Sequence, residues 1–215
     1  MALGLTIGAI ELGLYFFISH QLRKKWKQFG EMDALTYYWL AMTVLTLIWE
    51  CAFVLNYSNV VDDSEALIQH GEHVWTNQYD FSYVLPWKLS TIFYSEYGAY
   101  ADQEYMLRNN DWSRVIESTH AIFCGLFAYL ALHHKVKYKN TDKYLIMLSI
   151  SMGSQLMNSL LYMANYFNEL GYPSSVNYCS DEFPCGFALL HRPFMYVNIF
   201  WTCMPLYVIV KELKN

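Results

Sequence analysis

The sequence is poor in charge and lacks the residue patterns that bind nucleic acids or structural metals. Only 15% of its 215 residues are charged, against about 25% in an average soluble domain. The formal net charge is −5 and the fourteen lysines and arginines form no extended patch, which argues against nucleic-acid binding. A hydrophobic content of 55% excludes a disordered chain. The five cysteines show no Cys/His spacing typical of a zinc site.

What the sequence has instead is five long apolar blocks, each close to the roughly 20 residues that a helix needs to cross a bilayer. The blocks cover residues 2–19, 34–57, 113–134, 144–167 and 193–210. The first block has no basic n-region and no small-residue cleavage site, so we expect a retained helix and not a signal peptide. The sequence therefore predicts an all-α polytopic membrane protein, with residues 1–215 forming a single five-helix membrane domain.

The basic residues predict the orientation of these helices. Ten of the fourteen follow the first, third and fifth blocks: Arg23, Lys24, Lys25, Lys27, Lys135, Lys137, Lys139, Lys143, Lys211 and Lys214. The connection 58–111 contains nine acidic residues but only Lys88 and Arg108. By the positive-inside rule, the N-terminus is then lumenal or external and the C-terminus cytosolic.

The segments on the expected lumenal side have a mixed character. Residues 70–80 read as a polar loop, and 87–106 as an amphipathic helix at the membrane surface. Cys179 and Cys185 lie in the last lumenal connection, where an oxidising compartment permits a disulfide, although two reduced thiols fit equally well. The other three cysteines lie within spans and are expected to be small buried residues.

Ionisable side chains inside the apolar blocks are costly and call for an explanation. Glu11, Glu50, Glu117 and His120 are the four cases. Helical spacing puts Glu50 on one face with Thr46, and Glu117 on one face with His120. Uncharged polar or aromatic side chains line the later spans: Gln155, Asn158, Ser159, Tyr162, Asn198 and Trp201. Together they predict a central, partly polar cavity.

Simpler structural roles are open for several of these residues. Gln155, Ser159 and Asn198 could be hydrogen-bonding contacts between helices. His120 could be a core histidine with its hydrogen bonds satisfied, and Glu11 could face the lipid headgroups. Glu50 and Glu117 are harder to explain in this way, because they have no obvious lysine or arginine partner within the bilayer.

Several stretches, in order, resemble the emopamil-binding protein (EXPERA domain) family over about residues 35–212. Residues 48–57, IWECAFVLNY, resemble its second helix, and residues 87–105 its amphipathic segment with Glu-Tyr-Gly at 96–98. Residues 116–119 resemble the third helix and 155–162 the fourth. Residues 198–205 carry the Asn-x-x-Trp-x-x-x-Pro pattern of the fifth helix.

The resemblance implies a Δ8–Δ7 sterol isomerase of the endoplasmic reticulum that acts by protonation and deprotonation through a carbocation and needs no cofactor. Glu50 matches the acid of the proton relay and Glu117 the carboxylate near the cation. Asn198 matches a polar orienting group and Trp201 the aromatic wall, with Thr46, Gln155 and Tyr162 as further substrate contacts. The expected partners are a sterol or related polycyclic lipid and membrane lipids, and family members can also form homodimers.

One departure from the family bears directly on the chemistry. The isomerases carry a histidine one turn before the second-helix glutamate, where this chain has Thr46. Where they have threonine on the third helix, this chain has His120. We therefore expect the imidazole to have moved across the cavity, with Glu50, Glu117 and His120 as catalytic residues. The alternative is a non-catalytic protein that binds sterols or cationic amphiphiles; a transporter is disfavoured because no inverted repeat is visible.

Overall fold

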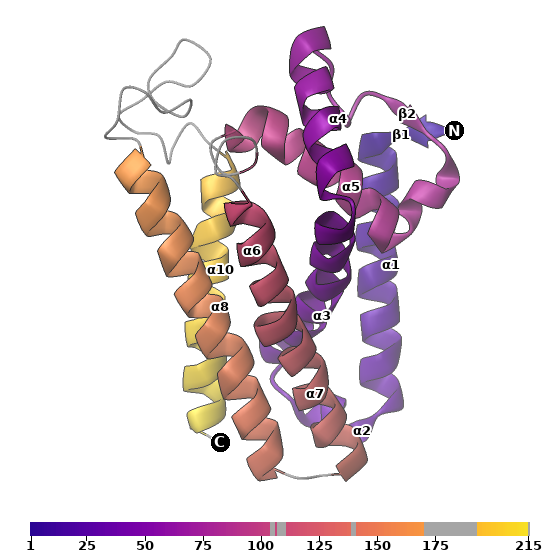
Figure 1. Cartoon of the computed structure of the whole chain (residues 1–215). Coiled ribbons are helices and arrows are strands. Elements are labelled where there is room, and N and C mark those ends of the chain that lie inside the picture. Colours follow the sequence, from indigo (N-terminus) through magenta and orange to yellow (C-terminus); the bar gives the residue numbers. More distant parts are fainter. Residues whose placement is uncertain (104–105, 107–110, 139–140, 170–192, 215) are drawn as a thin grey trace.

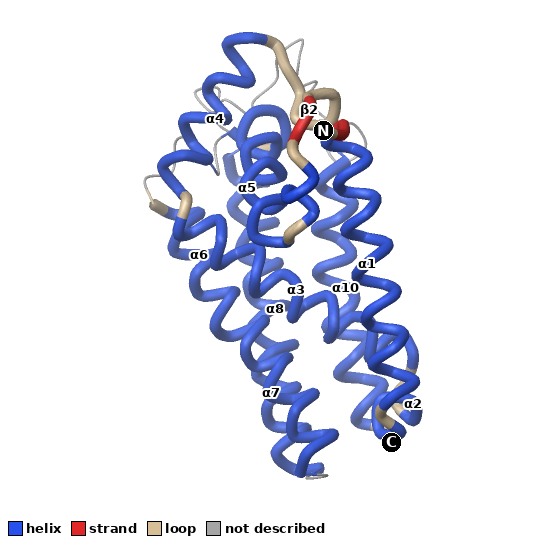
Figure 2. The backbone as a smooth tube through the Cα atoms, turned by 90° about the vertical axis from the view of Figure 1, so that its right-hand side faces the viewer, coloured by secondary structure: helices blue, strands red, loops and turns tan. Residues whose placement is uncertain are grey.

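The fold is a bundle of long helices with a small helical cap at one end (Figures 1 and 2). The computed structural model describes residues 1–103, 106, 111–138, 141–169 and 193–214. The N-terminus lies at the capped end and the C-terminus at the opposite end (Figure 1). Cys179 and Cys185, with the disulfide considered for them, lie outside the described residues.

Four helices in the described part of the chain are long and apolar enough to cross a membrane. They are α1 (Gly4–Lys25), α3 (Ala34–Leu55), the third span (Trp112–Tyr138) and the stretch Thr141–Ala164 of α8 (Thr141–Glu169). Helices of this length and hydropathy indicate an integral membrane protein. The fifth expected block corresponds to α10 (Pro193–Leu213), which packs along α8.

Exposed apolar side chains on these helices agree with a lipid environment. On α1, six large apolar residues are at least 43% exposed: Leu5, Leu12, Leu14, Phe16, Phe17 and Ile18. Water-soluble monomers rarely expose such contiguous apolar surface. The opposite face of α1 buries Ile7, Glu11 and Tyr15 against the protein.

The third span is not a uniform α-helix. It runs from α6 (Trp112–His120) through a π-helical segment, η4 (Ala121–Leu126), into α7 (Phe127–His133) and a second π-helical segment, η5 (His134–Tyr138). π-Helical turns inside α-helices occur frequently at functional sites. Here the first one begins directly after His120.

Helix α3 is the centre of the bundle, contacting α1, α5 (Pro86–Glu96), α10 and the third span. It begins where the Asp33 carboxylate accepts a hydrogen bond from the Thr36 backbone N–H at 3.0 Å. It ends where the Asn56 amide donates to the Ala52 carbonyl at 2.7 Å. Both caps satisfy backbone groups that would otherwise lack intrahelical partners.

The cap contains the loop expected at residues 70–80, interrupted by a two-residue strand, together with a helix that the sequence analysis did not expect. Helix α4 (Tyr57–His70) continues almost directly from α3 and ends at Gly71, whose positive φ of 64° favours glycine. Strands β1 (Ala2–Leu3) and β2 (Gln78–Tyr79) then pair antiparallel, a small exception to the all-α prediction. The short helices α2 (Lys27–Glu31) and η1 (Phe81–Val84) complete the connections.

The predicted amphipathic helix 87–106 is present in part. Helix α5 spans Pro86–Glu96 and is followed by a π-helical turn, η2 (Tyr97–Ala101). Its apolar face, with Leu89 and Ile92 buried, packs on α3 and α4. The segment is therefore docked on the helix bundle, because its apolar side chains find protein partners there.

Candidate functional site

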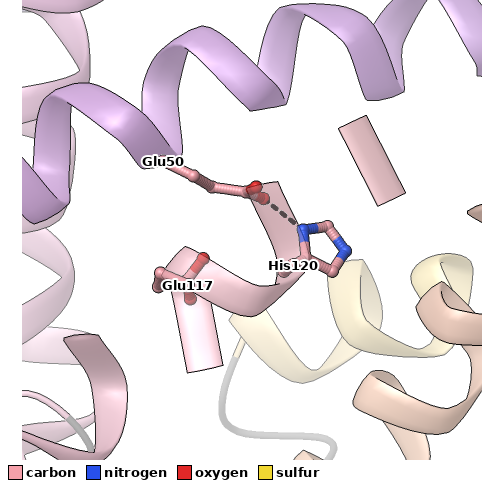
Figure 3. Close-up of side chains that lie close together, drawn as sticks. All are labelled: Glu50, Glu117 and His120. Carbon is pink, nitrogen blue, oxygen red and sulfur yellow. Dashed lines mark hydrogen bonds and ion pairs between the residues drawn. The ribbon is translucent and has the colours of Figure 1, made fainter. Parts of the chain in front are cut away.

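The centre of the candidate site is a pair of ionisable side chains from two spans (Figure 3). A Glu50 oxygen (Oε1) on α3 forms a hydrogen-bonded ion pair with His120 Nδ1 on α6. Both residues are buried. Glu117 lies one turn before His120, and one ligand atom from each of the three side chains lies within 4.8 Å of the others. The structure thus brings together the three predicted catalytic residues.

A close helix approach allows this pairing. At Gly125, an added Cβ would lie 3.0 Å from Leu47 Cα and 3.2 Å from the Thr43 carbonyl oxygen on α3. Only glycine leaves room for the two backbones at this distance. The Ser151 hydroxyl of α8 donates to the Cys124 carbonyl at 2.7 Å, which holds the π-helical segment against its other neighbour.

One oxygen of Glu50 stands apart from this pairing. Within the described part of the chain, the buried Oε2 atom has no hydrogen-bond partner. Leaving a buried acceptor unsatisfied costs roughly 1–3 kcal/mol, and more for a charged group. Such an atom is therefore suited to receive a proton or a ligand group.

Glu117 is oriented by a tyrosine from the cap. The Tyr94 hydroxyl donates to Glu117 Oε2 at 3.2 Å, and the Tyr94 ring stacks on Phe53 with ring centroids 4.3 Å apart. Burial, followed by the nearby charge of Glu117, raises the pKa of Tyr94 well above its ordinary value. Tyr94 therefore keeps its proton and acts as a hydrogen-bond donor.

Aromatic rings enclose the imidazole side of the site. The His120 and Trp201 rings lie 5.8 Å apart in an edge-to-face arrangement, and Trp201 contacts Trp39 at 4.8 Å. The Trp39 indole N–H donates to Gln155 Oε1 at 2.8 Å. The predicted residues Trp201 and Gln155 thus belong to one connected wall around His120.

Two other predicted contacts, Tyr162 and Asn198, belong to a second polar cluster. The Tyr162 hydroxyl donates to the buried Asp102 carboxylate at 2.6 Å and lies 2.6 Å from the Tyr97 hydroxyl. Tyr97 also hydrogen-bonds the Asn198 side chain. This cluster ties the cap to α8 and α10.

Thr46 is turned toward its own helix. Its hydroxyl donates to the Thr43 carbonyl at 2.9 Å. This bond satisfies the hydroxyl locally, as is common for threonine in helices. The structure therefore gives Thr46, which was expected to contact the substrate, a hydrogen-bond partner on its own helix.

Several contributors escaped the sequence analysis. Tyr94 and Trp39 contact the site from segments quoted only for their helical pattern, and the Cys124 thiol hydrogen-bonds His120. The sequence shows the helical spacing of these three residues, but it does not show the partners of Tyr94 and Trp39, which lie in distant segments of the chain. Among the cysteines expected to be buried, Cys124 is buried, whereas Cys51 and Cys203 are exposed.

Glu11 is buried against the protein, whereas the sequence analysis allowed it to face the lipid headgroups. It is 6% exposed and accepts a hydrogen bond from the Trp49 indole N–H at 3.0 Å. The Ser90 hydroxyl in turn bonds the Trp49 carbonyl at 2.6 Å, which joins α1, α3 and α5. This arrangement gives Glu11 a structural partner away from His120.

A hollow reaches the site from one side. It has a volume of about 340 Å³ and lies between the third span and α8. His120, Cys124 and Asn158 are among its lining residues. This hollow is lateral and lined by two elements only, so the central cavity expected from the sequence stays a prediction.

The residue types at the centre could also hold a metal ion. Two carboxylates and one imidazole are ligands that suit zinc or iron, although the sequence analysis expected neither metal nor cofactor. Arranged as a hydrogen-bonded pair with a neighbouring carboxylate, the same groups can instead hold and transfer protons.

No family model, curated protein or solved structure matches this chain.

Proposed function

We propose that this chain is a five-span membrane isomerase of the EXPERA type that moves a double bond in a sterol or related polycyclic lipid. The observation that carries the proposal is the Glu50–His120 pair. It supplies an imidazole beside the second-helix glutamate although Thr46 occupies the family's histidine position. A buried imidazole hydrogen-bonded to this glutamate is the arrangement that a proton relay needs, which supports the proposal.

The reaction requires only proton movement. The protonated Glu50–His120 pair gives a proton to one carbon of the double bond, which leaves a carbocation at the other carbon. Loss of a proton from a neighbouring carbon back to the pair forms the shifted double bond and restores the starting state. Atoms and charge balance without an oxidant, a reductant or a cofactor.

Two neighbouring groups stabilise the cation in this scheme. The Glu117 carboxylate, oriented by Tyr94, supplies negative charge near the pair. An aromatic face such as that of Trp201 contributes up to ~2 kcal/mol when water is excluded. Exclusion of water also strengthens the electrostatic stabilisation and protects the cation from hydration.

The topology proposed is lumenal for the N-terminus and cytosolic for the C-terminus, with α10 as the fifth span. Lys211 at the end of α10 lies 3.9 Å from Asp33 at the start of α3, and α2 contacts η5. The basic residues that follow α1, the third span and α10 therefore gather at one end, as the positive-inside rule requires of the cytosolic side. The endoplasmic reticulum follows from the family resemblance.

The test is complementation of yeast lacking sterol Δ8–Δ7 isomerase, with sterols identified by mass spectrometry. We expect Δ7 sterols with the natural chain and a loss on the order of a hundredfold or more for Glu50→Gln and His120→Phe. Glu11→Gln is the matched control, because Glu11 is also buried in a span but pairs with Trp49. Full activity of His120→Phe would refute the assigned mechanism.

A transplant sharpens this experiment. His120→Thr removes the imidazole, and the double variant Thr46→His/His120→Thr returns it on the α3 side of the site. We expect the single variant to be inactive and the double variant to regain measurable conversion. A protein that is well expressed and binds sterol but never converts it supports the second candidate, a binding protein whose carboxylates pair with cationic amphiphiles.

A further inference from the structure

The hollow beside His120 has a position that a buried enzyme site for a membrane lipid requires. It lies between two membrane-spanning helices, the third span and α8, and reaches the imidazole of the Glu50–His120 pair. We propose that the ring system of the lipid substrate reaches His120 sideways from the bilayer through this hollow. This inference rests on the proposed function and names the access route of that same site.

The lining of the hollow suits a polycyclic lipid with little polarity. Its exposed rim is mostly apolar: Phe123 is 46%, Met157 58% and Leu161 49% exposed, with Thr119 as an exposed polar neighbour. Its inner part adds the buried His120 and the half-buried Asn158. An apolar rim that leads to a few polar groups is the usual character of a small-molecule site.

The size of the hollow indicates that it encloses only part of a sterol-sized ligand. At about 340 Å³ it lies near the lower end of the range for ligand sites, roughly 300–1,000 Å³. A sterol-sized ring system would thus have its reacting edge in the hollow while the remainder stays in contact with hydrocarbon. The substrate then needs no passage through water.

One wall of the hollow has an irregular backbone, and the opposite wall has free space beside a glycine. The π-helical segment that follows His120 contributes Phe123 and Cys124 to the lining. On the α8 side, Gly153 has no atom within 4 Å of the position that a Cβ would occupy. A side chain introduced there would project into free space and fill the hollow without displacing a neighbour.

Gly153 therefore offers a way to block the route. We expect conversion to fall in steps along Gly153→Ala, Gly153→Leu and Gly153→Phe, with at least a tenfold loss for phenylalanine. The matched control is Gly13→Phe, because Gly13 of α1 also has nothing within 4 Å of an added Cβ but does not line the hollow. The control should retain the activity of the natural chain at equal expression.

Photolabelling of the natural chain tests the same route without relying on turnover. A cholesterol analogue with a ring diazirine, incubated with the natural chain in membranes, should label peptides around Thr119–Cys124 and Gly153–Leu161. Excess unlabelled sterol should suppress this labelling, and Gly153→Phe should reduce it at least fivefold. Labelling confined to other helices would overturn the inference.

The outcomes separate this inference from the proposed function. An active natural chain whose Gly153→Phe variant is fully active refutes the access route but leaves the isomerase intact. An inactive chain that is labelled at the hollow refutes the isomerase but leaves a lipid site there. Absence of both conversion and labelling at the hollow overturns both.

Discussion

Gly125→Ala should disable the site by pushing two helices apart. The added Cβ would lie 3.0 Å from Leu47 Cα and 3.2 Å from the Thr43 oxygen, whereas unstrained carbon contacts lie at about 3.5–4.0 Å. The third span must therefore move away from α3 by roughly 0.5–1 Å. The Glu50–His120 pair bridges these same two elements and will lengthen with the shift.

Two magnitudes follow from this displacement. Overpacking of this kind costs about 1–3 kcal/mol of stability, partly offset by the roughly 0.5–1 kcal/mol that alanine gains over glycine in a helix. A misplacement near 1 Å in a catalytic site costs on the order of a hundredfold in rate. Activity should thus fall much further than stability.

The assay compares Δ7-sterol formation with the melting temperature of the purified protein in detergent. Gly13→Ala is the control, because nothing lies within 4 Å of an added Cβ at that position. Leu47→Gly in the Gly125→Ala background removes the nearest side-chain contact and should restore part of the activity. A Gly125→Ala protein that melts and turns over like the natural chain would refute the argument.

Three further predictions concern other parts of the molecule. The hydrogen bond from the Thr36 backbone N–H is the main cause that holds the pKa of Asp33 below its ordinary value of 3.8. The ionised Asp33 carboxylate therefore stabilises the folded protein fully above that pH, and this stabilisation is lost as the pH falls through the lowered pKa. Asp33→Ala should therefore cost about 0.5–2 kcal/mol at pH 7, and melting curves should converge with the natural chain in acid; a constant difference would contradict this. Tyr94→Phe removes one hydrogen bond to a carboxylate, worth about 1.5 kcal/mol, and should slow conversion roughly tenfold without loss of folded protein; an unchanged rate would exclude a role for Tyr94 in orienting Glu117. Incubation with EDTA should leave conversion unchanged, since the proposed steps move only protons; a loss restored by Zn²⁺ would instead assign a metal to the Glu50–Glu117–His120 cluster.

The sequence predicted those features that depend on local pattern. The block 34–57 became α3 (Ala34–Leu55) because the backbone of a mostly apolar run in a membrane must form its hydrogen bonds within the helix. The three-residue spacing of Glu117 and His120 put both on one face, as helical geometry requires. The family resemblance then paired this face with Glu50.

Features that depend on contacts between distant segments were not predictable in the same way. Residues 57–70 are too polar to signal a span, yet they form α4, whose buried face packs on α5. The bond between Trp49 and Glu11 joins positions 38 residues apart, and no periodicity within either helix indicates it. The π-helical segment after His120 likewise depends on Gly125 fitting against α3 and on the Ser151 bond from α8.

The three buried or half-buried glutamates of the spans differ in what their partners can do. Glu11 is bonded by an indole N–H and Glu117 by a phenol, and neither donor exchanges its proton readily near neutral pH. Glu50 pairs with an imidazole, a side chain that can both donate and accept a proton. Within the described residues, Glu50 also keeps one oxygen without a donor, on a pair that a lateral hollow reaches. We therefore assign the proposed proton transfer to Glu50 and His120, whereas Glu11 is bonded to Trp49 and joins α1 to α3.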